Sequence, residues 1–175
     1  MGIFSNSEKL LSLQDLLHYE LRDLYSGETQ LIEALPKMEE AASHPQLKEA
    51  FKMHLNETRA QRERLDEIGR LLDIDMKGEK CEAMAGLVKE GSEIIKSKST
   101  PEVRDAGLIG AAQRVEHYEI AGYGTARNFA EQLGLTQVVA LLTETENEEK
   151  MTDEKLNRLA KETINLSAKT AHANE

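Results

Sequence analysis

The sequence has one cysteine, no tryptophan and only three prolines among its 175 residues. Because Cys81 is the only cysteine, the chain forms no internal disulfide and carries no cysteine-rich zinc or iron site. Aromatic residues make up 4% of the chain, and the prevailing Ala, Leu, Glu and Lys favour helices over sheets. These absences predict an all-α protein.

Long apolar runs and an excess of positive charge are also missing. No stretch approaches the roughly 18 apolar residues that a membrane span needs, and residues 1–11 lack the charged start and apolar core of a signal peptide. The 32 acidic residues outnumber the 22 basic ones, which gives a formal net charge of -10. This balance disfavours nucleic acids and anionic membranes as partners and attracts cations. We therefore expect a cytoplasmic protein.

The length fits a single domain, residues 1–175. We expect the bundle to cover about residues 13–166, with a loose arm before it and a frayed tail from about Ser167. Apolar periodicity predicts four long helices, each with a start signal. These signals are a capping-box-like Ser12, Pro45 in a first turn, Thr100 followed by Pro101, and Thr136 as a cap.

A long connection separates the second and third long helices. It runs from Asp73 to Thr100 and contains a short amphipathic helix over residues 81–96. This length permits a crossover along the bundle rather than a tight hairpin. The third long helix should stop at Gly134. Its internal glycines cost roughly 1 kcal/mol each relative to alanine, which predicts close helix packing as compensation.

Acidic residues lie at inward positions of the long helices. Glu28 is the only charged member of the apolar stripe on the first helix, and Glu116 and Glu119 lie one turn apart on the third. Burying an ionised carboxylate costs several kcal/mol unless something compensates the charge. A metal ion is one such partner, and solvation in a shallow groove or pairing with arginine is the alternative.

The second and fourth helices present further inward polar residues, namely His54, Glu57, Gln61, Glu149 and Asp153. A dinuclear carboxylate site usually takes one Glu from each of two helices and a Glu-x-x-His pair from each of the others. Here His54 precedes Glu57, which reverses that order, and the fourth helix has no histidine. The pattern leaves open whether His54, Gln61 or neither completes the pair, and whether Glu148 or Glu149 is the inward acid, although the apolar stripe runs through Glu149.

Carboxylate oxygens with occasional imidazole suit iron or manganese, and bridging carboxylates hold two ions close together. We therefore predict two iron ions, with manganese as the alternative, and no separate catalytic residue. The predicted metal ligands are Glu28, His54, Glu57, Glu116, Glu119, Glu149 and Asp153.

Several segments together match a known pattern: Asp-Leu-Tyr-Ser-Gly-Glu at 23–28, His-Leu-Asn-Glu-Thr at 54–58, Glu-His-Tyr-Glu-Ile at 116–120 and Glu-Glu-Lys at 148–150. They resemble the bacterial YciE/YciF stress proteins of the ferritin-like superfamily, over about residues 13–160. The resemblance implies a ferritin-like four-helix bundle with a short extra helix, homodimerisation, and similarity to rubrerythrin and other di-iron proteins. By motif position it implies ligand roles for Glu28, Glu57, Glu116, Glu119 and Glu149, and it implies a histidine where this chain has Gln61.

Two functions from different classes follow. The first is a di-metal oxidoreductase of ferroxidase or peroxidase type that reacts with dioxygen or peroxide. Such an enzyme would take electrons from a separate donor protein, because the chain has no cysteine pairs to hold a second iron centre. The second is a dimeric structural or interaction bundle whose inward acids are paired, without catalytic turnover.

Overall fold

The structure, a computed structural model, describes residues 9–78 and 80–171. No strand occurs among these residues, which confirms the predicted all-α class. The elements are α1 (Leu13–Ala41), α2 (Pro45–Leu72), α3 (Glu82–Lys96), α4 (Pro101–Gln132), α5 (Thr136–Leu159), the π-helical turn η1 (Ala160–Ile164) and α6 (Asn165–Thr170).

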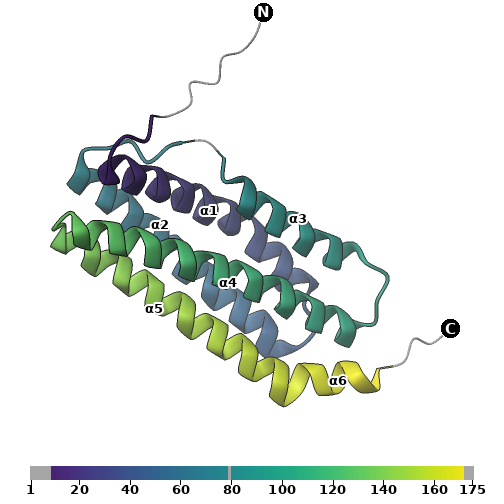
Figure 1. Cartoon of the computed structure of the whole chain (residues 1–175). Helices are drawn as coiled ribbons and strands as arrows, with labels where there is room; N and C mark the ends of the chain where they lie inside the picture. Colours follow the sequence, from purple (N-terminus) through teal and green to yellow (C-terminus); the bar gives the residue numbers. More distant parts are fainter. Residues whose placement is uncertain (1–8, 79, 172–175) are drawn as a thin grey trace, which may run out of the picture.

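The four long helices form the bundle (Figure 1). α1 packs against α2 and α4, and α5 packs against the same two helices, while α3 lies on the outside of α1 and α4. The connection that carries α3 runs back along the bundle, so α2 and α4 point in the same direction (Figure 1). The predicted crossover with its short helix is therefore confirmed.

Most of the predicted helix starts are present. The Ser12 hydroxyl accepts a hydrogen bond from Asp15 N at 3.1 Å, and the Thr100 hydroxyl accepts one from Val103 N at 3.4 Å. The prediction for Thr136 was wrong, because it is the first helical residue and not the cap. Gly134 has a left-handed φ of 72° and forms the turn that ends α4. Only Leu135 then precedes α5.

The C-terminal end also differs from the prediction. Instead of fraying from about Ser167, the chain continues through η1 into α6 and remains helical to Thr170. The predicted N-terminal arm covers residues 1–11, of which 1–8 lie outside the described part of the chain.

The apolar core consists of two clusters with a polar layer between them. One cluster includes Leu21 and Leu65, and the other includes Leu31 and Phe51. On each long helix a group of buried polar positions lies where the residues of one cluster give way to those of the other. This polar layer consists of Glu28, His54, Thr58, Gln61, Glu116, Glu119, Thr145, Glu149 and Thr152.

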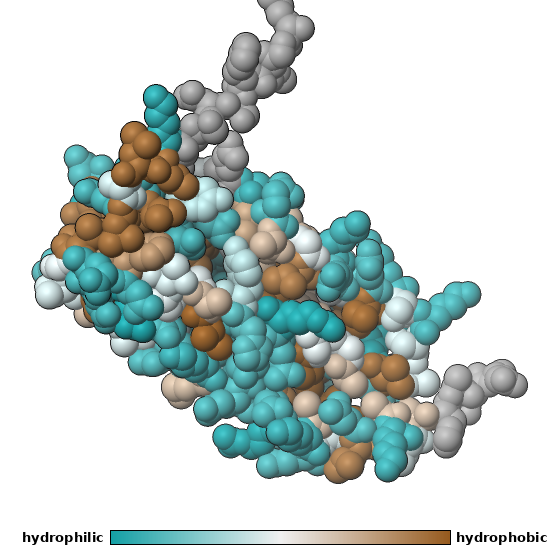
Figure 2. All heavy atoms as spheres, in the orientation of Figure 1, coloured by the Kyte–Doolittle hydropathy of each residue, from teal (hydrophilic) through white to brown (hydrophobic). Residues whose placement is uncertain are grey.

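The face of the molecule drawn in Figure 2 is mostly hydrophilic, as expected from the charge. Figure 2 shows hydrophobic side chains gathered at the end of the bundle where α1 begins and α4 turns into α5. Leu11 is the most exposed large hydrophobic residue there, at 84%. Within residues 9–78 and 80–171, no helix is both long enough and apolar enough to cross a lipid bilayer.

Candidate metal centre

Four side chains of the polar layer converge at its centre. His54 of α2, Glu116 and Glu119 of α4, and Glu149 of α5 each offer one ligand atom, and these atoms lie within 4.8 Å of one another. His54 Nε2 lies 3.1 Å from Glu116 Oε1, and all four side chains are buried. Ligand atoms about 2.1 Å from a shared ion lie up to about 4.2 Å apart. Small side-chain movements therefore suffice for all four to bind one cation.

Most donor atoms of this group make no hydrogen bond with other described residues, although His54 Nε2 and Glu116 Oε1 are within ion-pair distance of each other. Neither nitrogen of His54 makes a hydrogen bond, nor does either oxygen of Glu116 or Glu149, nor Oε2 of Glu119. Leaving a buried donor or acceptor unsatisfied costs about 1–3 kcal/mol, more for a charged group. A cation satisfies such a set of oxygens and imidazole nitrogens together, so the group fits a metal.

Glu28 of α1 lies beside these four residues. The Tyr123 hydroxyl donates a hydrogen bond to its Oε1, while Oε2 has no partner. Burial raises the pKa of Glu28 to about 8, although the Tyr123 bond and His54 act in the opposite direction. Glu28 thus brings a further carboxylate oxygen to the buried group.

The electrostatics of the layer favour added positive charge. Burial raises the pKa of Glu119 and of Glu149 well above the usual value, and repulsion between the carboxylates raises both further. Burial alone would lower the pKa of His54, but the Glu116 carboxylate and neighbouring acids outweigh it and the pKa is raised. The metal-free layer therefore holds protons, which a metal ion would replace.

The other two predicted ligands lie nearer the surface. Glu57 is 30% exposed, and its Oε2 lies 3.7 Å from His54 Nδ1. Asp153 accepts a hydrogen bond from Gln113 at 3.0 Å and lies 3.6 Å from the imidazole of exposed His117. The structure does not bring either residue into the central group of four, and their ligand roles stay predictions.

An arginine clamp next to the layer separates Glu148 from Glu149. Arg64 donates two hydrogen bonds of 2.7 Å to the two oxygens of Glu148, and Gln61 donates one to it at 3.1 Å. Glu149 is consequently the acid that belongs to the buried group. Sequence reasoning did not single out this clamp, although Arg64 lies two helical turns after Glu57 on the same face.

A second group missed by the sequence reasoning lies where α3 meets α1 and α4. The Cys81 thiol donates to Asp23 at 3.1 Å and lies 3.1 Å from the Tyr118 hydroxyl, which itself donates to Asp23. Burial raises the pKa of the Cys81 thiol, and its sulfur accepts a hydrogen bond from Met84 N at the start of α3. Cys81 therefore anchors the crossover helix as a neutral thiol.

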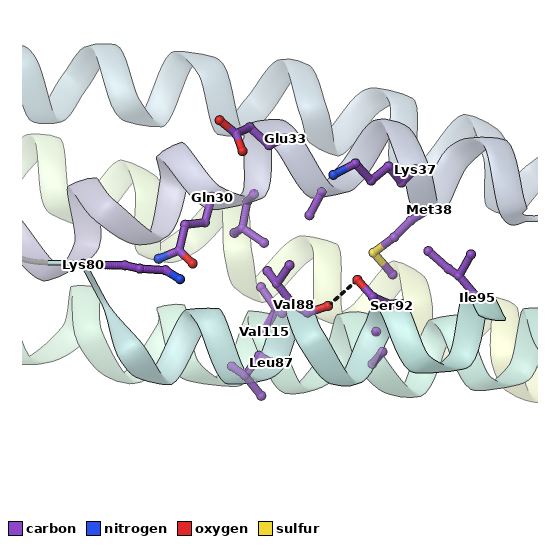
Figure 3. A pocket seen from close by; sticks show the side chains of 14 residues that line it. Gln30, Glu33, Lys37, Met38, Lys80, Leu87, Val88, Ser92, Ile95 and Val115 are labelled. Carbon is purple, nitrogen blue, oxygen red and sulfur yellow. Dashed lines mark hydrogen bonds between the residues drawn. The ribbon is translucent and has the colours of Figure 1, made fainter. Parts of the chain in front are cut away.

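A cavity of about 190 Å³ lies between α1 and α3, apart from the polar layer (Figure 3). Aliphatic side chains such as Leu31 and Val88 line it, and Lys37 and Lys80 lie at its edge. Its lining has one carboxylate, that of Glu33, and no imidazole. The cavity therefore lacks the ligand set of a metal site.

Comparison with known proteins assigns the chain to a family. A family model described as a domain of unknown function, DUF892, matches residues 12–169. The YciF protein of Escherichia coli strain K12 is 48% identical over 158 residues, which is 90% of this chain and 95% of YciF.

Solved structures agree with this assignment. The crystal structure of the E. coli stress protein YciF matches with a TM-score of 0.86 and 47% identity, over 89% of this chain and 99% of that one. A Rhodopseudomonas palustris protein, YcfI, proposed to be structural, matches with a TM-score of 0.83 and 42% identity, over 89% and 98% of the two chains. A Xanthomonas campestris protein at 18% identity and a TM-score of 0.71, over 90% and 97%, shares the fold. The chain thus belongs to the DUF892 family, as a relative of the stress protein YciF.

Proposed function

We propose that this protein binds a dinuclear iron or manganese centre in the polar layer of its bundle. The observation that carries the proposal is the buried group of His54, Glu116, Glu119 and Glu149 with its unpartnered donor atoms. Glu28 adds a fourth carboxylate from α1. With four carboxylates and one imidazole, two ions are held only if carboxylates bridge them, as in other dinuclear sites.

Iron held by such ligands supplies one-electron chemistry with dioxygen or peroxide. The chain's own residues position the ions and exclude bulk water, because the apolar clusters on both sides of the layer seal it along the bundle axis. The Tyr123 hydroxyl holds a proton at Glu28 Oε1. Electrons come from a separate donor protein, and the relative YciF, a stress protein, supports a role under stress.

A structural role without turnover is the second candidate. The positions three residues after Glu57 and Glu149, where a Glu-x-x-His pair would place histidine, hold Ala60 and Thr152. The R. palustris relative is also proposed to be structural. In this alternative the protein is a dimer whose buried carboxylates stay protonated.

Metal content distinguishes the two functions. The protein purified without chelator, then loaded anaerobically with Fe²⁺, should hold near two metal ions per chain, and a near-ultraviolet absorbance should develop when air is admitted. Replacing Glu119 by Gln removes a central ligand and should abolish loading, whereas Glu33→Gln on the exposed face of α1 should not. Metal content that stays far below one ion per chain after loading would favour the structural role.

A further inference from the structure

Glu57 joins the buried group to the surface between α2 and α5. Its two oxygens face different surroundings. Oε2 lies 3.7 Å from His54 Nδ1 and accepts a hydrogen bond from the Thr152 hydroxyl at 3.4 Å. Oε1 lies 3.8 Å from the amine of Lys155, whose side chain is 46% exposed. One carboxylate therefore contacts both the innermost imidazole and a surface cation.

Lys155 is a loosely held partner for this carboxylate. A single contact of 3.8 Å between partly exposed side chains contributes little to stability, because water screens it. By contrast, the Arg64 guanidinium holds Glu148 through two bonds of 2.7 Å. The interface between α2 and α5 is thus held by a strong ion pair at Glu148 and only by a weak one at Glu57.

The other sides of the layer are less open to a cation. Between α1 and α4, a Cβ at Gly122 would lie 2.9 Å from Leu24 Cδ2, so these helices touch, and α3 covers them from outside. Arg62 lies over the Tyr25 ring between α1 and α2, and its charge repels cations. Between α4 and α5, Asp153 is occupied by Gln113.

We propose that metal cations reach the buried group through Glu57, an inference that rests on the proposed function. The carboxylate exchanges Lys155 for an incoming cation and passes it along the imidazole of His54, whose Nδ1 faces Glu57 and whose Nε2 lies 3.1 Å from Glu116. Glu57, His54 and Glu116 form a sequence of donors from the surface inward. Glu57 is then a transient ligand that sets the rate of loading, and the central group sets the amount of metal bound.

Loading kinetics test this role directly. The chain has no tryptophan, so its intrinsic emission comes from tyrosine, and Tyr123 lies against Glu28. Co²⁺ mixed anaerobically with the metal-free protein should quench this emission as it binds. Stopped-flow fluorescence gives the rate of loading, and equilibrium dialysis with metal analysis gives the final stoichiometry.

Two variants have matched controls in the same chain. Glu57→Gln should slow loading by about tenfold and leave the stoichiometry unchanged, whereas Glu131→Gln, at a side chain 45% exposed that pairs with Arg127 outside the polar layer, should load at the normal rate. Lys155→Gln should speed loading by about twofold. Lys150→Gln, at a side chain 48% exposed that pairs with Glu146, should leave the rate unchanged.

Three results overturn the proposal in different ways. Equal rates in Glu57→Gln and the unmodified protein, or equal slowing in Glu131→Gln, exclude a route through Glu57. A reduced stoichiometry in Glu57→Gln makes this residue a permanent ligand rather than a transient one. If the unmodified protein binds no Co²⁺, Fe²⁺ or Mn²⁺, the proposed function itself is wrong, and the route is overturned with it.

Discussion

The buried acids of the polar layer could bind a metal ion, but burying them destabilises the metal-free protein. Glu119 is fully buried, its Oε2 has no partner, and both burial and repulsion from Glu28 raise its pKa. We predict that Glu119→Gln stabilises the metal-free protein by about 1–3 kcal/mol near neutral pH, because the amide avoids the free energy that folding costs an acid whose pKa it raises. Thermal unfolding in the presence of chelator measures this gain.

The same substitution should remove the stabilisation that metal confers. A ligand that binds only the folded state raises the melting temperature, so the unmodified protein should gain stability with Mn²⁺ while Glu119→Gln should not. Glu33→Gln serves as the control, because Glu33 is exposed on α1. A lower melting temperature for chelated Glu119→Gln would mean that the carboxylate already has a satisfied partner in the metal-free protein.

At the scale of helices, replacing two glycines in different surroundings by alanine should change the stability of the protein in opposite directions. A Cβ at Gly122 of α4 would lie 2.9 Å from Leu24 Cδ2, whereas a Cβ at Gly86 of α3 would meet nothing within 4 Å. We predict that Gly122→Ala destabilises the protein by about 1–3 kcal/mol through overpacking. Gly86→Ala should stabilise it by about 1 kcal/mol through helix propensity. Urea unfolding midpoints at an unchanged m-value measure both effects.

Close packing at the glycines of α4 was predictable only in part from the sequence. Their presence in a long helix implied compensation by helix contact, and Gly107 and Gly122 do sit against side chains, those of Ile94 and Leu24. For Gly110, however, the nearest atom belongs to Arg114 of its own helix at 4.0 Å. Stability of Gly122→Ala equal to that of the unmodified protein would show that Leu24 moves aside without loss.

The sequence predicts a helix end where a side chain caps its own helix. Asp105 shows what such signals miss: its buried carboxylate accepts hydrogen bonds from Ser43 N and His44 N at 2.8 Å each. These bonds join the turn between α1 and α2 to α4, across 61 and 62 residues of sequence. The π-helical turn η1, which packs against α4, likewise has no distinct pattern in the sequence.

At the scale of the whole molecule, the polar layer was predictable because each long helix shows the same interruption of its apolar stripe. Glu28, Glu119 and Glu149 are buried where periodicity placed them. Periodicity gives a direction around each helix but not the depth of a side chain, so it did not distinguish Glu57 from the buried acids. Depth depends on the distance between helices, which here leaves Glu57 beside Lys155 at the surface.

The folded molecule as a whole should lose stability as the pH rises. An acid whose pKa is raised by folding binds more protons in the folded state, so the unfolding free energy falls between the unfolded and folded pKa values. For Glu28 this interval runs from 4.5 to about 8, and Glu119 and Glu149 act in the same direction. His54, a base whose pKa is also raised, loses its contribution as pH rises through its folded pKa.

We therefore predict that the melting temperature of the chelated protein falls between about pH 5 and about pH 8. Metal should have the opposite dependence, because cations bind the deprotonated carboxylates and compete with protons. The increase in melting temperature caused by saturating Mn²⁺ should consequently grow over the same interval. Glu28→Gln removes one of the titrating groups and should make the fall in melting temperature less steep, because an amide does not titrate in this pH range. A chelated protein whose melting temperature rises from pH 5 to pH 8 would show that the buried carboxylates stay ionised without metal, and a cation other than a proton would then have to neutralise them.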